Sequence, residues 1–291
     1  MGKKHGRADT LVRKFSLNLM TSRKGEGYVR MLTIKDLLEA GVHFGHQTNR
    51  WNPKMRPYIF GEKNGIYIID LKQSAQLFHR AYSFVRDTVA AGETVLFVGT
   101  KRQAVNIVEE EATRCNMFYV TQRWLGGMLT NFQTIRKSII QLKKLEAAQT
   151  DGTYDRLKKK EILLMEKARG KLEKYFNGIK HMENLPGCVF ILDTRIQHIT
   201  VKEANRLGIP VVAIVDTNCD PEGIDFPIPG NDDAIRSLKL FTAQIANACI
   251  EGQAMIDKQD APVAQEEDSI MADMISARTS ESSSGGIQTP A

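Results

Sequence analysis

Long apolar runs and paired cysteines are both missing from this chain of 291 residues. The longest strongly apolar run covers Val211 to Val215, far short of the roughly 18 residues that a membrane span needs. We therefore expect no integral membrane protein and no membrane partner. The cysteines are scattered without a C-x-x-C pair, which favours reduced, intracellular thiols over a disulfide framework or a zinc knuckle. They are Cys115, Cys188, Cys219 and Cys249.

The sequence also lacks the motifs of several enzyme classes. It contains no G-x-S-x-G elbow, no S-x-x-K and no H-E-x-x-H, and no carboxylate spacing singles out an acid/base pair. Neither nucleotide-binding pattern, G-x-x-x-x-G-K-[ST] or G-x-G-x-x-G, is present. We predict no catalytic activity and no small-molecule substrate. A nucleotide-dependent enzyme with a Rossmann-like domain is kept as the alternative, to be tested by nucleotide binding.

What the chain does contain is enough apolar material for a core, because 42% of its residues are hydrophobic and 25% are charged.

The charge of the chain is unevenly distributed. Residues 1–30 carry a net charge of +6 and residues 131–180 carry +7, whereas residues 181–250 carry −4 and residues 251–291 carry −6. The chain is basic up to residue 180 and acidic afterwards. We therefore expect one side that binds a polyanion and a second side of different character.

Buried strands and amphipathic helices alternate in two parts of the chain, 31–130 and 181–255. Continuous apolar strands are predicted at 94–98, 188–192 and 210–215, with helices between them, and this pattern is typical of a parallel sheet covered on both faces. Shorter strands are predicted at 66–69 and 117–120. Helices are expected near 33–40, 72–91, 101–114, 199–207 and 232–252, and an irregular stretch at 43–60.

Residues 131–180 interrupt the alternation. Two apolar stripes at helical spacing, separated by a turn at Asp151-Gly152, predict an inserted antiparallel helical hairpin of the coiled-coil type.

The two ends of the chain lack core residues. We expect a basic disordered extension at 1–30, with an organellar transit peptide the less favoured reading, and an acidic, serine-rich disordered tail at 256–291.

Three basic segments are candidates for contacts with RNA. The loop with Arg50, Trp51, Lys54 and Arg56 suits irregular RNA, although a protein interface would have the same composition. The turn after strand 94–98 brings Lys101 and Arg102 to a helix start, where a phosphate site and a plain structural turn are equally good readings. The third segment starts at Arg123 and Trp124 and includes the hairpin. For Trp124, composition slightly favours a buried anchor over a residue that stacks on a base. The hairpin candidates are Lys137, Lys143, Lys144, Lys158 and Lys159.

A divalent cation is a secondary hypothesis. His46, Asp216 and Asp233 supply hard ligands beyond the carboxyl edge of the predicted sheet, where α/β folds bind ligands. Turn and helix-cap roles for Asp216, Asp220 and Asp232 explain most of the same residues without a metal. No cofactor is otherwise required.

Seven strings in order resemble the family of bacterial small-subunit ribosomal protein two across about residues 31–255. They are Gly41-Val-His-Phe-Gly-His46, Trp51-Asn-Pro-Lys-Met55, Phe97-Val-Gly-Thr-Lys101, Arg123-Trp-Leu-Gly-Gly-Met-Leu-Thr-Asn131, Gly208-Ile-Pro-Val-Val212, Val215-Asp-Thr-Asn218 and Ile228-Pro-Gly-Asn-Asp-Asp-Ala-Ile-Arg236. The resemblance implies a Rossmann-like α/β domain with an inserted coiled-coil hairpin. It also implies a structural role in the small subunit of a cytoplasmic bacterial ribosome, with binding to small-subunit ribosomal RNA, to other small-subunit proteins and to ribosomal protein one.

Overall fold

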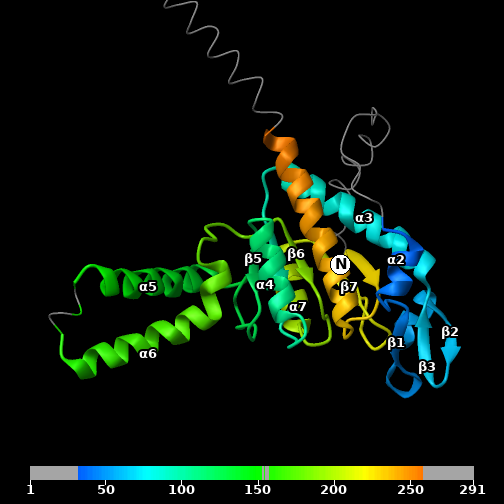
Figure 1. The fold of residues 1–291 in the computed structure, drawn as a ribbon, viewed down its shortest axis with the longest axis horizontal. Coiled ribbons are helices and arrows are strands. Elements are labelled where there is room, and N and C mark those ends of the chain that lie inside the picture. The colour runs from blue at the N-terminus through cyan, green and yellow to red at the C-terminus, as the bar shows by residue number, and fades with distance from the viewer. Residues whose placement is uncertain (1–31, 153, 155–156, 258–291) are drawn as a thin grey trace, which may run out of the picture. The chain divides into compact units, whose positions relative to one another are not determined.

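A computed structural model describes residues 32–152, 154 and 157–257 of the chain. The predicted extension at 1–30 and almost all of the predicted tail at 256–291 lie outside these residues. The described residues belong to one compact unit that begins at Leu32. Within it, a five-stranded parallel sheet carries helices on both faces, as predicted (Figure 1).

The strands of this sheet are β4 (Val95–Val98), β5 (Phe118–Val120), β6 (Cys188–Ile191), β7 (Val211–Val215) and β8 (Phe226–Pro229). Their order across the sheet is β5-β4-β6-β7-β8, and every neighbouring pair is parallel. The strand order reverses between β4 and β6, which is where open α/β sheets bind ligands. The sequence analysis missed β8, whose two prolines suit a strand at the sheet edge.

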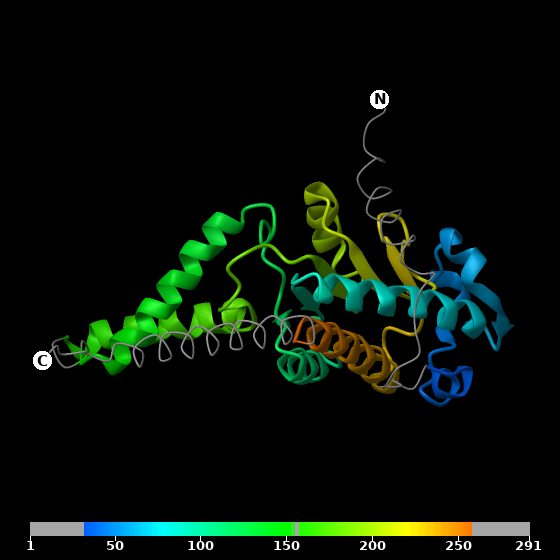
Figure 2. The same ribbon diagram turned by 90° about the horizontal axis from the view of Figure 1, so that it is seen from above.

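Alternate residues of each strand point to opposite faces, and each face has its own buried core. On one face Phe97 and Phe190 pack with α3 (Leu71–Ala90), α4 (Val105–Arg114) and the C-terminal helix at 235–257. On the other face Val98 and Ile191 pack with α7 (His198–Leu207) and with the base of the helical hairpin. Figure 2 shows these two helical layers from above.

The hairpin consists of α5 (Phe132–Thr150) and α6 (Lys159–Phe176), which lie side by side and are followed by η5 (Asn177–Ile179) (Figure 1). Ile135, Ile139 and Leu142 are buried and join the second core, so the apolar stripe of α5 is where the sequence placed it. The helical spacing of apolar residues in α6 predicts that Leu164 faces α5, but 60% of its surface is exposed. The predicted apolar contact of the hairpin is therefore strongest near the sheet.

The stretch at 43–60 is more regular than predicted. It follows α2 (Ile34–Glu39) and contains β1 (Phe44–Gln47), η2 (Thr48–Arg50) and η3 (Pro53–Tyr58), and β2 (Ile59–Lys63) begins at its end. Strands β1 and β2 pair with β3 (Ile66–Ile69) in a separate antiparallel sheet of order β1-β3-β2. This small sheet carries His46 and the basic loop.

Candidate functional site

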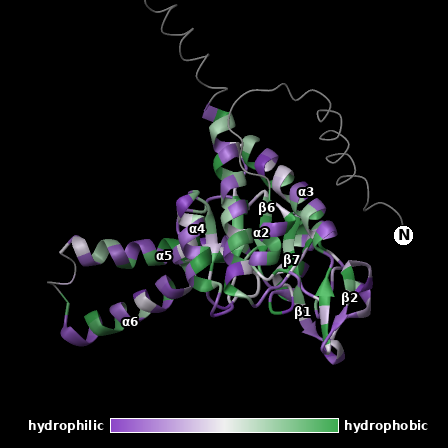
Figure 3. Ribbon diagram, turned by 45° about the vertical axis from the view of Figure 1, so that its right-hand side comes forward, coloured by the Kyte–Doolittle hydropathy of each residue, from purple (hydrophilic) through white to green (hydrophobic). Residues whose placement is uncertain are grey.

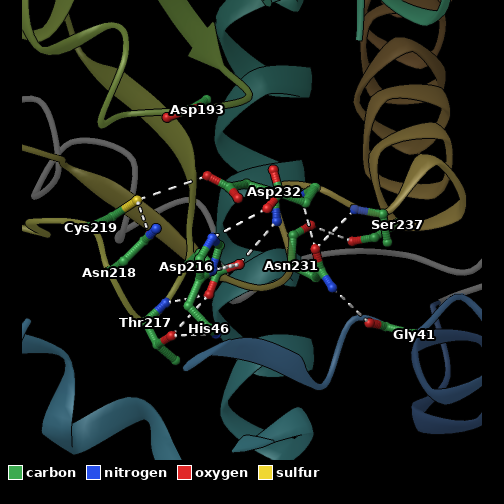
Figure 4. A network of polar contacts seen from close by, with 12 residues as sticks. Gly41, His46, Asp193, Asp216, Thr217, Asn218, Cys219, Asn231, Asp232 and Ser237 are labelled. Carbon is green, nitrogen blue, oxygen red and sulfur yellow. Dashed lines mark hydrogen bonds and ion pairs between the residues drawn. The ribbon is translucent and has the colours of Figure 1, made fainter. Parts of the chain in front are cut away.

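A polar network lies at the carboxyl edge of the parallel sheet, where β1 meets the end of β7 (Figure 4). The approach is close because residue 45 is a glycine. A Cβ at Gly45 would lie 2.6 Å from Cγ2 of Thr217, closer than two carbon atoms can pack. The amide of His46 then donates to Oγ1 of Thr217 at 2.9 Å. This contact brings the imidazole of His46 over the end of β7.

The imidazole of His46 lies between two carboxylates. Its Nδ1 is 3.2 Å from Oδ2 of Asp216, and its Nε2 is 3.2 Å from Oδ2 of Asp233. The contact with Asp216 raises the pKa of His46, although burial opposes the shift. An imidazolium would satisfy both contacts, since its two nitrogens are then both donors.

Lys101 neutralises the same cluster from the other side. Its Nζ lies 2.8 Å from Asp193, 2.9 Å from Asp232 and 2.8 Å from Asp233. Burial acts to lower the pKa of Lys101, but these carboxylates outweigh it and the pKa is raised. All three ammonium protons thus have partners within the protein. A phosphate at Lys101 would therefore compete with three carboxylates of the protein itself.

His46, Asp216 and Asp233, the residues of the predicted cation site, are brought together, but the neighbouring Asp232 joins them. Ligand atoms of His46, Asp216 and Asp232 lie within 4.8 Å of one another, whereas Asp233 contacts the opposite nitrogen of the ring. Asp232 is 1% exposed, and burial followed by repulsion from Asp216 raises its pKa to about 7. Its expected role as a helix cap belongs instead to Asn231, whose side chain accepts from the amides of Asp233 and Ala234.

A second polar centre lies at the base of the hairpin. The buried carboxylate of Glu203, on α7, accepts five hydrogen bonds of 2.8–3.1 Å from the segment that leads into α5. The donors are the indole N–H of Trp124, three backbone amides and the hydroxyl of Thr130. One of those amides belongs to Gly127, whose φ of +87° is the left-handed conformation that glycine adopts without strain. Burial acts to raise the pKa of Glu203, but the donors outweigh it and the pKa is lowered.

Trp124 is therefore buried, with 6% of its surface exposed, as the anchor interpretation expects. Nothing in the sequence pattern linked Glu203 to this segment, because 79 residues separate it from Trp124. Buried glutamates are rare without a partner. The position of Glu203 on the apolar side of α7 was the only signal in the sequence that this glutamate is buried and paired.

The loop at 50–58 keeps part of its predicted character. Arg50 and Arg56 are exposed, and no ion pair involves them among the described residues. Trp51 is half-buried, and its ring centroid lies 5.1 Å from that of Tyr67. Lys54 instead pairs with Asp220 at 2.9 Å and with Glu222, which reduces its availability to a phosphate.

The hairpin carries the largest group of uncompensated cations. Arg169 is held along α6 by Glu166 and Glu173, both at 2.9 Å. The other cations of this group are exposed and make no ion pair with any residue that the structure describes, and Figure 3 shows long hydrophilic stretches on both helices. They are Arg136, Lys137, Lys143, Lys144, Lys158, Lys159, Lys160, Lys167, Lys171 and Lys174. All five hairpin lysines singled out from the sequence are among them. Arg102 and Arg123 are exposed as well.

Comparison with known proteins now decides the family. The model of the family described as ribosomal protein S2 matches residues 37–252. The chain belongs to the ribosomal protein S2 family. It is 63% identical over 221 residues to small ribosomal subunit protein uS2 of Geotalea uraniireducens (strain Rf4), a match that covers 76% of this chain and 86% of that one. It is 59% identical over 230 residues to the uS2 protein of Syntrophobacter fumaroxidans (strain DSM 10017 / MPOB), which covers 79% of this chain and 84% of the relative.

Membership of the S2 family makes this chain a small-subunit ribosomal protein and not an enzyme, and the alternative of a nucleotide-dependent enzyme is dropped. Two side-chain contacts lie at the carboxyl ends of β4 and β6. There Lys101 pairs with Asp193, and the amide nitrogen of Gln197 donates to the hydroxyl of Thr100 at 2.6 Å. Among the described helices, none is both long and apolar enough for a membrane span.

Proposed function

We propose that the chain binds small-subunit ribosomal RNA through the exposed cations of its hairpin and through Arg50 and Arg56 of the basic loop. The observation that carries the proposal is the absence of ion pairs for these hairpin cations within the described part of the chain. A surface of one sign repels itself, and a polyanion removes that cost. Arginine and lysine contacts with phosphates supply most of the affinity of such complexes.

The test is the salt dependence of binding to a transcript of small-subunit ribosomal RNA. Each phosphate contact contributes about 0.7–0.9 to the slope of log affinity against log salt. Replacing Lys137, Lys143 and Lys144 by glutamine should reduce that slope by roughly two to three units. The matched control replaces three exposed cations on the opposite helical layer by glutamine. These control residues are Lys72, Arg80 and Lys239.

The control variant has the same net charge as the hairpin variant. A general effect of net charge would reduce both slopes equally and contradict the proposal. An unchanged slope for the hairpin variant would contradict it too. The hairpin cations are exposed and unpaired within the described chain, so both variants are expected to keep the wild-type unfolding curve.

The acidic part of the carboxyl edge, which follows β7 and β8, is proposed as the side that faces other ribosomal proteins, including ribosomal protein one. Asp233 is exposed there, shortly after β8, and a surface of this sign is unsuited to RNA. The proposal includes assembly in a bacterial cytoplasmic ribosome. Replacing Asp233 by asparagine should weaken binding of purified ribosomal protein one and leave RNA affinity unchanged. Unchanged binding of that protein would remove the acidic edge from the interface.

One divalent cation at His46, Asp216 and Asp232 is a second candidate function of the same edge. Two carboxylates buried side by side favour a cation, and an imidazole nitrogen is a ligand that suits Zn²⁺. Elemental analysis of protein purified without chelator should find about one equivalent, which His46→Ala removes. The control Asp233→Asn, next to the site but outside the ligand group, should keep it. Protein that contains no metal under these conditions contradicts the candidate.

A further inference from the structure

Three neighbouring strands of the parallel sheet are each followed by an exposed arginine. Arg123 comes three residues after the end of β5, and Arg102 and Arg195 come four residues after the ends of β4 and β6. The three strands are adjacent in the order β5-β4-β6 and parallel, so their carboxyl ends meet at one edge. Neighbouring strands are about 4.8 Å apart. The three arginines therefore follow adjacent strands at the same edge of the sheet.

These arginines are free of the charge pairing that dominates the rest of the edge. No ion pair or side-chain hydrogen bond involves Arg102, Arg123 or Arg195 within the described residues. The acidic group nearest in sequence to Arg195 is Asp193, which is 3% exposed and pairs with Lys101 at 2.8 Å. Its charge is thus used inside the protein, and the guanidinium groups outside it stay uncompensated.

We infer that Arg123, Arg102 and Arg195 form an arginine row that holds successive phosphates of one RNA strand. The inference rests on the proposed function and extends its surface beyond the hairpin and the basic loop. Guanidinium groups suit the purpose, because each presents two parallel N–H donors to a phosphate. The sequence analysis did not select Arg195, since it lies in a segment whose net charge is −4.

The occupant is an RNA strand and not a free nucleotide. A nucleotide would have to enter the crevice between β4 and β6, but Lys101, Asp193 and the pair of Gln197 with Thr100 occupy it. The turn after β4 also lacks the glycine motifs that cradle a nucleotide phosphate. The arginine row lies outside this crevice and continues, through Arg123, into the segment that begins the hairpin. A single polyanionic strand can follow both.

Two variants on the same helix connection test the inference. Arg195 precedes α7 at the carboxyl edge, whereas Arg206 is exposed in the last turn of α7, at the opposite edge of the sheet. Arg195→Gln and Arg206→Gln therefore remove the same charge from opposite edges. The affinity of full-length protein for small-subunit ribosomal RNA is measured at 50 and 200 mM salt for wild type and both variants.

For each protein, the dissociation constant at 200 mM salt is divided by that at 50 mM salt. For Arg195→Gln this ratio should be about threefold smaller than for wild type, which corresponds to one lost phosphate contact. The ratio should stay at the wild-type value for Arg206→Gln. Equal behaviour of the two variants would overturn the arginine row. If the triple hairpin variant still lowers the salt slope, the proposed RNA-binding function stands without the arginine row. If that variant leaves the slope unchanged, the proposed function and the arginine row are both overturned.

Discussion

The carboxylate of Glu203 accepts the indole N–H of Trp124 at 3.1 Å and so joins α7 to the segment that begins the hairpin. Four further donors from Gly127, Leu129 and Thr130 surround the same carboxylate. The hairpin therefore starts from a point fixed on the sheet's helical layer.

Glu203→Gln should lower the free energy of unfolding by about 1–3 kcal/mol, because the amide nitrogen of glutamine faces backbone donors that then have no acceptor. Urea denaturation measures the change. Glu110→Gln, an exposed carboxylate on α4, is the control and should change stability by less than about 0.5 kcal/mol. Equal effects of the two substitutions would show that the contacts of Glu203 contribute nothing.

The contribution of Glu203 should depend on pH in one direction. Its pKa in the folded protein lies below the ordinary value of 4.5, so the folded state favours the ionised form. The stabilisation is therefore fully present above about pH 4.5 and is lost as the pH falls through the folded pKa. The difference in unfolding free energy between wild type and Glu203→Gln should be constant near neutral pH and shrink in acid. A difference that grows in acid would contradict the assignment.

Trp124→Ala should act on stability and not on RNA contacts. Removing a buried tryptophan costs about 3–5 kcal/mol. Thermal or urea unfolding should show this loss. Under conditions where the variant is folded, the salt slope of RNA binding should remain that of the wild type, because no phosphate contact is lost. A stable variant with weakened RNA binding would support the base-stacking interpretation.

Stacking of Trp51, half-buried in the basic loop, on an RNA base stays a prediction. Trp51→Ala should weaken RNA binding by about 1–3 kcal/mol with little change in salt slope, as expected for loss of stacking. Arg56→Gln, in the same loop, should instead reduce the slope by about one unit. Filter binding at several salt concentrations separates the two. A change in slope with Trp51→Ala would show that the loop itself has moved.

Hydrophobic pattern predicted the parallel sheet because its strands are apolar on both faces, as at Val211–Val215. The small antiparallel sheet escaped prediction because β1, with the sequence Phe-Gly-His-Gln, has no apolar alternation. Its strands form through pairing with β3, which is a contact that no local pattern specifies.

The candidate site was predictable only to the level of its elements. His46 and Asp216 were expected together, since the carboxyl ends of parallel strands share an edge, and they are 3.2 Å apart. Which of the neighbours Asp232 and Asp233 points inward depends on a turn of the backbone that composition does not encode. Likewise a lysine beside a helix start has the same sequence signal whether its partner is a phosphate or, as for Lys101, three carboxylates.

Photo-crosslinking within assembled small subunits tests the central claim most directly. A photoreactive amino acid replaces Gln141, exposed on α5 among the hairpin cations, or Gln76, exposed on α3 in the opposite helical layer. The account predicts crosslinks from position 141 to small-subunit ribosomal RNA in clear excess over position 76. Equal yields at the two positions, or crosslinks from position 141 to proteins alone, would contradict it.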